Sequence, residues 1–364
     1  MTIKDVAACC GVSVSTVSRV LNHRPDVSPA VREKVERAIK ECHYIPSNTA
    51  RDLVRPQSDA IGVVVRGADN PFFTPIIRSI GQAVEQAGYT MVLHQILVND
   101  DELAAGAALA RSKRLKGLIL MGGFYDYTPE RTAVLEVPFV CCTYANSLGS
   151  LDKDTYSSVS IDDQAEACRA VRQLINLGHR RIAVLVDSTG DRSISELRYR
   201  GYLRALQEAG IQPDRELVIQ TGDFSMEAAY RKTRQLLERR GDVTAIFAIA
   251  DSVAIAAMKA IHDAGKRVPE DCSIIAIDGI DMSLYTIPTL TTLIQPQETM
   301  GAQAVEILTD VLEGRAASRH VRLETTLRQG GSVAPPPAFS RENRQKELQI
   351  PRLGPAVVTV NACP

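Results

Sequence analysis

The sequence predicts a small all-α domain followed by an α/β domain with two lobes, each built on a doubly wound parallel sheet. Short amphipathic helical patterns fill residues 1–46. From residue 60, apolar strand runs alternate with helical patterns, which is typical of parallel sheets covered by helices on both faces. The alternation restarts near residue 161, so we expect two similar lobes with a ligand cleft at the carboxyl ends of their strands.

Composition indicates a globular protein. The 364 residues are 45% hydrophobic and 23% charged, which suggests two or three domains. The net charge is −1, but residues 1–55 carry nine Lys or Arg against six Asp or Glu. No apolar run approaches the roughly 20 residues of a membrane span, and residues 1–10 lack a signal-peptide pattern. We therefore expect a cytoplasmic protein without membrane contact.

Neither a metal nor a cofactor is expected. The eight cysteines contain no C-x-x-C and the six histidines are scattered without ligand spacing. Reduced thiols packed as small hydrophobic groups are the simpler interpretation. The chain also lacks G-x-S-x-G, the P-loop, G-x-G-x-x-G and H-E-x-x-H patterns, so an enzyme is not expected.

Residues 2–21 predict two short helices separated by a turn at Gly11, with Thr2 and Ser13 as N-caps. A third helix begins at Ser28 and Pro29. Two helices joined by so short a turn form a helix-turn-helix. The apolar faces predict one small core, composed of Ile3, Val6, Ala7, Cys10, Val14, Val17, Val20, Leu21, Val31, Val35, Ala38 and Ile39.

The other face of the second helix carries Ser15, Thr16, Ser18 and Arg19. Short hydroxyl side chains let a helix lie deep in the major groove of DNA, and arginine can bind guanine with two hydrogen bonds. A plain three-helix bundle with a polar face is the alternative.

The α/β region is expected over residues 59–333. The first lobe comprises about 60–160 plus 293–319, and the second comprises about 161–292 plus 320–333. The predicted strands are 60–65, 89–96, 117–121, 139–144, 181–186, 216–221, 245–249 and 273–278. The predicted helices are 75–88, 101–114, 164–178, 196–210, 226–240 and 251–265.

Polar and aromatic residues follow the first strand. Asp69 and Asn70 can form hydrogen bonds, and Phe72 and Phe73 offer ring faces on which a sugar can stack. For Phe73, a place in the core is an equally good interpretation.

The stretches "TIKDVA", "GVS" and "STVSRVLN" closely resemble the N-terminal DNA-binding domain of the LacI/GalR family of bacterial transcription regulators. The resemblance continues more loosely to about residue 333. It implies a repressor that binds a near-palindromic operator in double-stranded DNA as a homodimer, with a periplasmic-binding-protein-like domain for a small-molecule effector. It also implies base contacts from Val14, Ser15, Thr16 and Arg19, and backbone contacts from Ser13, Ser18 and Asn22.

The same resemblance implies effector contacts from both lobes. Phe72 is favoured as ligand-facing, and the other implied residues are Arg192, Arg198, Phe224, Asp251 and Asp278. Thr143, Ala250, Ala276 and Gly279 depart from the usual family pattern. A carbohydrate is the default effector, and a sugar phosphate, a nucleobase or no effector at all stay open.

Residues 47–58 match the family's hinge helix, with Ser47 as cap and Pro56 as stop. Asn48, Thr49, Ala50 and Leu53 would share the face toward DNA, and Leu53 would insert between base pairs from the minor groove. The alternative is that Leu53 packs against one of the neighbouring domains.

Two other classes of protein are alternatives. A cytosolic solute-binding protein or enzyme could carry an incidental N-terminal bundle, and an architectural DNA protein would leave the two-lobed body unexplained. Residues 334–364 are Pro-rich and are expected to be a flexible tail. They contain no leucine heptad, so a dimer is expected rather than a tetramer.

Overall fold

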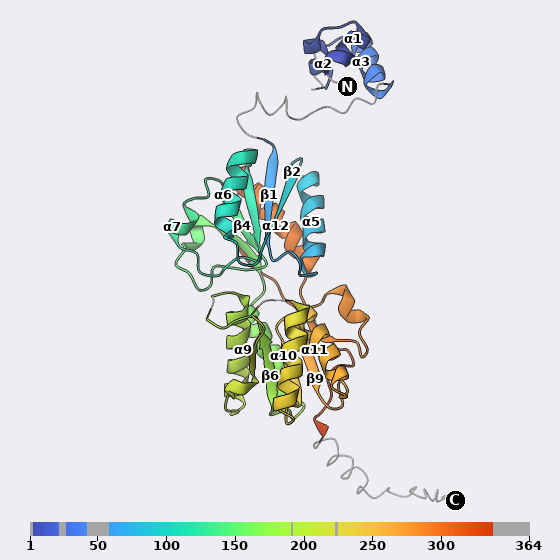
Figure 1. Cartoon of the computed structure of the whole chain (residues 1–364). Helices are drawn as coiled ribbons and strands as arrows, with labels where there is room; N and C mark the ends of the chain where they lie inside the picture. Colours follow the sequence, from blue (N-terminus) through green and yellow to red (C-terminus); the bar gives the residue numbers. More distant parts are fainter. Residues whose placement is uncertain (1–2, 22–26, 42–57, 191, 223–224, 338–364) are drawn as a thin grey trace, which may run out of the picture. The chain divides into compact units, whose positions relative to one another are not determined.

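The computed structural model describes residues 3–21, 27–41, 58–190, 192–222 and 225–337. The chain divides into two compact units, Met1–Ser58 and Asp59–Pro364, which can be followed in Figure 1. Each unit has its own hydrophobic core.

The first unit contains the three helices α1 (Ile3–Cys10), α2 (Val14–Leu21) and α3 (Pro29–Glu41). Gly11 adopts a φ of 60° in the turn between α1 and α2, a conformation that favours glycine. The predicted helix-turn-helix is confirmed, but Val14 was wrongly assigned to the core, because it is 40% exposed on the outer face of α2. The buried core consists of Val6, Ala7, Cys10, Val17, Val20, Val35 and Ala38.

The first sheet of the second unit has six parallel strands in the order β11-β5-β4-β3-β1-β2. Its strands are β1 (Ala60–Arg66), β2 (Thr90–Ile96), β3 (Gly117–Met121), β4 (Phe139–Cys142), β5 (Ser157–Ser160) and β11 (His320–Arg322). Its helices are α5 (Phe73–Gln86), α6 (Glu102–Lys113), α7 (Pro129–Thr132) and α12 (Gln297–Leu312).

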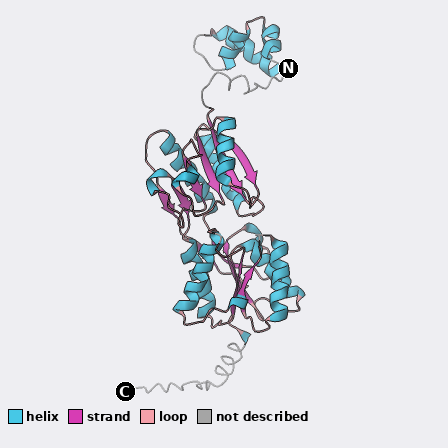
Figure 2. Cartoon of the chain, turned by 60° about the vertical axis from the view of Figure 1, so that its left-hand side comes forward, coloured by secondary structure: helices cyan, strands magenta, loops and turns pink. Residues whose placement is uncertain are grey.

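Helices cover both faces of this sheet, as Figure 2 shows. Alternate residues of β1 enter different cores: Ile61 and Val63 pack with residues of α5 and α12, whereas Ala60 and Val64 pack with residues of α6. This double coverage explains why β1 is apolar from Ala60 to Val65.

The second sheet has the order β12-β10-β9-β8-β6-β7. Its strands are β6 (Ile182–Val186), β7 (Val218–Gln220), β8 (Ala245–Ala248), β9 (Ser273–Asp278), β10 (Thr291–Ile294) and β12 (Thr326–Arg328). Helices α8 (Asp163–Asn176), α9 (Ile194–Glu208), α10 (Met226–Arg239) and α11 (Asp251–Asp263) accompany it. Short 3-10 turns occupy η1 (Lys153–Thr155), η2 (Arg215–Leu217) and η3 (Asp281–Leu284).

The expectation of a wholly parallel second sheet is wrong at one strand, because β12 pairs antiparallel with β10. The predicted return to the second lobe at residue 320 is also early, since β11 pairs with β5 in the first sheet. The antiparallel direction of β12 follows from the path of the chain. The chain leaves the carboxyl edge of the first sheet after β11 and reaches β12 within a few residues. It therefore enters the second sheet at its carboxyl edge and must run against the other strands.

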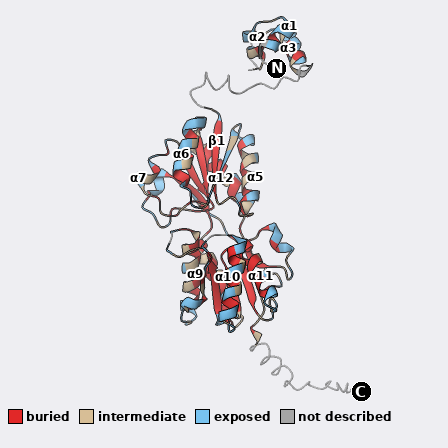
Figure 3. Ribbon diagram, viewed as in Figure 1, coloured by how far each residue is buried: buried red, intermediate tan, exposed pale blue. Residues whose placement is uncertain are grey.

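Burial follows this layering: Figure 3 shows most strands as buried and the outer sides of the helices as exposed. The cysteines of the described ranges follow the same pattern, since Cys10, Cys141, Cys142, Cys168 and Cys272 are buried free thiols and Cys9 is exposed. None of the helices in the described ranges has the length and apolarity that crossing a bilayer requires.

Candidate functional site

The first candidate site is the outer face of α2. Ser13 caps the helix, since its hydroxyl accepts a hydrogen bond from the Thr16 amide at 3.1 Å and lies 2.7 Å from the Ser15 hydroxyl. Val17 and Val20 fix the opposite face in the core, so Val14, Ser15 and Arg19 are exposed together, with Thr16 and Ser18 half-buried beside them. Such a face, next to a helix N-terminus, can contact phosphates and base edges.

Several predicted residues lie outside the described part of the chain. For DNA contact these are Asn22, Asn48, Ala50 and Leu53, and for effector contact Phe224.

The second candidate site is a cavity of about 740 Å³ between the two sheets. It lies at the carboxyl ends of strands from both sheets, where a ligand of an α/β protein is expected. The first lobe supplies Arg66, Asp69, Asn70, Phe72, Phe73, Phe124, Tyr125, Thr143 and Tyr144 among others. The second lobe contributes Asp187, Ser188, Ser193, Arg198, Ser225, Ser252 and Asp278, and Gln295 comes from the segment after β10.

Arg198 organises the second-lobe wall. Its side chain is only 2% exposed, and its Nε and a terminal nitrogen lie 3.0 and 2.9 Å from Asp163 Oδ1. Another terminal nitrogen lies 3.4 Å from Asp278 Oδ1 and also donates to the Ile249 carbonyl. Tyr125 from the first lobe donates to Asp163 Oδ2 at 3.2 Å. The network therefore joins the two lobes through Asp163.

Asp278 is the most perturbed carboxylate of the cavity. Burial raises its pKa to about 7, because the loss of water outweighs the attraction of Arg198. Its Oδ2 is buried and accepts no hydrogen bond from a described residue. Its φ of 141° is unusual for a residue with a side chain, and strain of this kind concentrates at functional sites. Asp278 is therefore poised to accept a hydrogen bond from a ligand.

Asp278 is also tied to the chain segment that crosses between the lobes. Gln295 donates through Nε2 to Asp278 Oδ1 at 2.9 Å and through its amide to the Asp278 carbonyl at 3.1 Å. Gln297, the first residue of α12, donates through Nε2 to the same carbonyl at 3.0 Å. A change at Asp278 therefore reaches the crossing segment directly.

Two sequence-predicted contacts need correction. Asp251 does not line the cavity: one carboxylate oxygen accepts from the amides of Gly279 and Ile280 at 3.0 Å, and the other accepts from Thr292. Asp251 therefore fixes the conformation of the loop that follows Asp278. Arg192 does not line the cavity either, because its side chain is 65% exposed and pairs with Asp126 at 3.5 Å.

The first-lobe wall contains the predicted aromatic pair. Phe72 and Phe73 are both buried and both line the cavity, and their ring centroids lie 5.5 Å apart. Asn70 holds the turn before them by accepting a hydrogen bond from the Phe72 amide at 3.1 Å. Asp69 is exposed at the cavity edge.

Sequence reasoning missed several wall residues, chiefly Arg66, Phe124 and Gln295. A charged residue closing an apolar strand was one available signal, because Arg66 ends β1. Phe124 follows β3 by three residues, but an aromatic residue just after a buried strand usually packs in the hydrophobic core. Nothing in the local sequence marks Gln295, since its role depends on pairing with Asp278.

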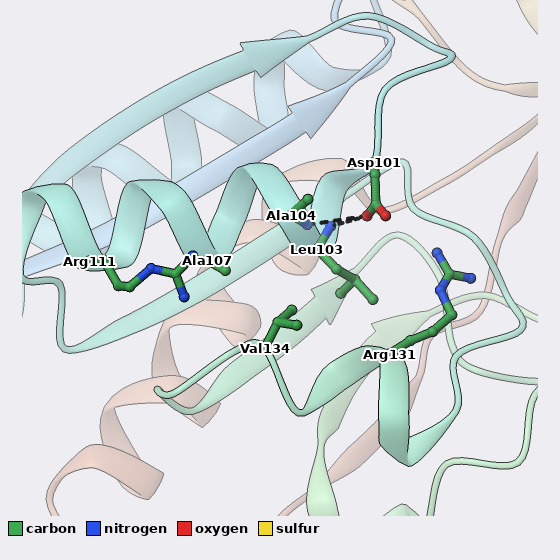
Figure 4. A pocket seen from close by; sticks show the side chains of 7 residues that line it. All are labelled: Asp101, Leu103, Ala104, Ala107, Arg111, Arg131 and Val134. Atoms are coloured by element: carbon green, nitrogen blue, oxygen red, sulfur yellow. Dashed lines mark hydrogen bonds between the residues drawn. The ribbon is translucent and has the colours of Figure 1, made fainter.

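A second hollow of about 320 Å³ lies between α6 and α7. Figure 4 shows Arg111 and Arg131 at opposite ends of it and the Asp101 carboxylate turned to the backbone of α6. Aliphatic residues form the remainder of its lining, and no set of polar groups converges there. The larger cavity is therefore the better ligand site. Across the described ranges, no group of side chains could hold a metal ion.

Family models match both parts of the chain. Residues 2–47 match the model for "Bacterial regulatory proteins, lacI family", and residues 171–333 match that for a periplasmic binding protein-like domain. These matches coincide with the helix-turn-helix unit and with most of the second sheet.

Similar proteins align over nearly the whole chain. The HTH-type transcriptional regulator MalR of Clostridium butyricum is 41% identical over 336 residues, covering 90% of this chain and 97% of the relative. The HTH-type transcriptional repressor PurR of Erwinia tasmaniensis is 35% identical, covering 92% of this chain and 98% of the relative.

Solved structures lead to the same family. A complex of the transcriptional regulator CelR with cellobiose has a TM-score of 0.68 and 31% identity, covering 91% of this chain and 99% of that one. The Lac repressor dimer bound to operator and the anti-inducer ONPF has a TM-score of 0.73 and 28% identity, covering 92% and 99%. The chain belongs to the lacI family of bacterial regulatory proteins and is a DNA-binding transcriptional regulator, not an enzyme.

Proposed function

We propose that this chain is a cytoplasmic repressor that binds a near-palindromic operator as a homodimer and responds to an uncharged sugar of about two rings. The observation that carries this proposal is the cavity, in which aromatic faces from one lobe oppose hydrogen-bonding groups from the other. The exposed hydroxyl and arginine face of α2 supplies the DNA-reading surface.

The cavity size and lining support a sugar. Its volume of about 740 Å³ lies within the range of roughly 300–1,000 Å³ that is usual for small-molecule sites. Phe72, Phe73 and Phe124 line it, and aromatic rings can pack against the C–H surface of a sugar. Asp278, Arg198 and the serines can bind hydroxyl groups, and the solved relative CelR holds cellobiose.

The charge of the cavity favours a neutral ligand over a sugar phosphate. Arg66 and Arg198 line it together with Asp69, Asp187 and Asp278. Each arginine is additionally paired with a carboxylate behind the wall, Glu102 at 3.8 Å and Asp163 at 2.9 Å. A phosphate group carries about −1.5 to −2 charges and would meet an excess of carboxylates. A nucleobase is less suited, because it would leave many of the hydroxyl-binding groups without partners.

Sugar binding would be coupled to DNA through the angle between the lobes. A ligand that contacts both walls stabilises one arrangement, and the equilibrium shifts by the difference in its affinity for the two arrangements. The bonds from Gln295 and Gln297 to Asp278 carry the change into the crossing segment and α12. Helix α12 packs against α5 in the first lobe, so ligand contact in the second lobe is transmitted to the first.

On DNA, α2 would enter the major groove in each half of the operator. Ser15, Thr16 and Arg19 would contact bases, together with Val14, and Ser13 and Ser18 would contact the backbone. The N-terminal charge excess of three is small, so two linked headpieces are needed for affinity. The hinge contacts proposed for Asn48, Ala50 and Leu53, and those of Asn22 and Phe224, extend this scheme to residues outside the described ranges.

A thermal-shift screen tests the effector class. Full-length protein is melted with sugars, sugar phosphates and nucleobases, beside an Arg198→Met variant and an Arg180→Met control in which an exposed arginine is replaced. We expect a neutral disaccharide to raise the melting temperature of the native chain and of the control but not of Arg198→Met. Stabilisation by a nucleobase alone would contradict the sugar assignment.

A further inference from the structure

An arginine is built into the first-lobe wall. Arg66 ends β1 and is only 8% exposed. Its Nε donates to the Gly122 carbonyl at 2.7 Å and a terminal nitrogen donates to the Val98 carbonyl at 2.6 Å. The guanidinium carbon lies 3.9 Å from the centre of the Phe124 ring. Arg66 therefore has a fixed position at the cavity surface.

A buried carboxylate stands behind this arginine. Glu102, the first residue of α6, is fully buried. Its Oε1 accepts from the Phe124 amide at 3.0 Å and from the Tyr127 hydroxyl at 2.5 Å. Its Oε2 accepts no hydrogen bond from a described residue and lies 3.8 Å from Arg66 Nε. Oε1 therefore holds the loop that contains Phe124 and Tyr127, whereas Oε2 places negative charge beside the Arg66 guanidinium.

We propose that Glu102 is a specificity-determining residue, which rests on the proposed function: its charge offsets that of Arg66, so that the first-lobe wall accepts neutral hydroxyl groups and rejects anions. Arg66 then acts as a donor of N–H groups to the ligand without acting as an anion site. Glu102 itself does not touch the ligand and works through Arg66.

The second lobe is built in the same way, which supports this interpretation. Arg198 also faces the cavity, and Asp163 lies behind it at 2.9 Å. In both walls an arginine supplies hydrogen-bond donors and a buried carboxylate offsets its charge. If Glu102 had only a structural role, glutamine could replace it, because the glutamine carbonyl oxygen can accept both hydrogen bonds that Oε1 accepts.

The test compares neutral and anionic versions of one probe. Binding of glucose, maltose and cellobiose, each beside its 6-phosphate, is measured by calorimetry for the full chain, Glu102→Gln, Arg66→Met and the control Glu130→Gln. Glu130 is exposed in the same lobe. The quantity of interest is the ratio of phosphate to neutral affinity.

We expect Glu102→Gln to raise this ratio by roughly ten- to a hundredfold for each unit of phosphate charge. This is the Coulomb energy lost when one charge about 6–10 Å away is removed at an effective dielectric constant near 20. Arg66→Met should lower the ratio, and Glu130→Gln should leave it unchanged. An unchanged ratio in Glu102→Gln that still binds the neutral probe would overturn the inference.

The unsubstituted chain alone tests the inference even if both variants fail to fold. It must bind the neutral member of its best pair at least about tenfold more tightly than the phosphate, and equal or tighter binding of the phosphate overturns the inference. If the native chain binds neither member of any pair, the proposed effector class fails, and the inference falls with it.

Discussion

Asp278 should make the stability of this protein depend on pH in a predictable direction. Burial raises its pKa from 3.8 to about 7, so the folded chain holds the proton more tightly than the unfolded chain. The contribution of Asp278 to the free energy of unfolding is therefore most favourable at low pH. It falls as the pH rises from about 4 to about 7. Each pKa unit corresponds to about 1.4 kcal/mol, which gives about 4 kcal/mol over the full range.

The substitution Asp278→Asn removes this titration while keeping the shape of the side chain. Its carbonyl oxygen can still accept from Arg198 and Gln295, which both approach Oδ1. Between pH 5 and pH 8, the native chain should lose about 3 kcal/mol of unfolding free energy relative to Asp278→Asn. At pH 8, where Asp278 is ionised, Asp278→Asn should also bind the effector more weakly, because a carboxylate acceptor becomes an amide donor at the position of Oδ2.

The assay is denaturant unfolding of native chain, Asp278→Asn and an exposed control, Asp154→Asn, at pH 5 and pH 8. The control should follow the native chain at both pH values. If Asp278→Asn loses as much stability as the native chain between the two pH values, the raised pKa of the buried Asp278 is wrong.

Three further outcomes follow from the same contacts. Gly201→Ala should destabilise the second unit by about 1–3 kcal/mol, because a Cβ there would lie 2.6 Å from the Ala167 Cβ where α8 meets α9; an unchanged denaturation midpoint would contradict this. Gln295→Ala should weaken the effect of effector on operator binding more than it weakens effector binding, and calorimetry beside operator titrations would separate the two. Arg19→Ala should lower operator affinity by about 1–3 kcal/mol if it reads a base pair and leave the effector affinity unchanged; equal loss on scrambled DNA would identify a phosphate contact instead.

Much of the fold could be predicted from local pattern. The strand β1 is apolar from Ala60 to Val65 because both of its sides are buried, and the spacing of Val17 and Val20 defines the inner face of α2. These features depend on neighbours within a few residues, so the sequence alone reveals them.

Elements stabilised by distant partners were missed. Strand β5 is rich in serine and does not read as a buried strand, yet the structure buries all of it. Ser157 accepts a hydrogen bond from the Arg319 amide, and Ser158 pairs with His320 at 2.8 Å. Those partners lie about 160 residues away in the chain, where no local pattern reveals them.

The site was predictable in position but not in side-chain direction. Phe72, Arg198 and Asp278 were expected at strand ends and line the cavity. Asp251 and Arg192 follow strands in the same way, but Asp251 is held by the amides of the next loop and Arg192 by Asp126. Competing partners of this kind become visible only once the chain is folded.

The most direct test measures operator affinity with and without effector. Full-length protein is used to select duplexes from a random library, and its affinity for the selected duplex is titrated with the sugar identified by melting. The proposed function requires a two-fold symmetric sequence and an affinity that changes about 5- to 150-fold when the sugar saturates the protein. Selection of no symmetric sequence, or an affinity that the bound sugar leaves unchanged, would contradict it.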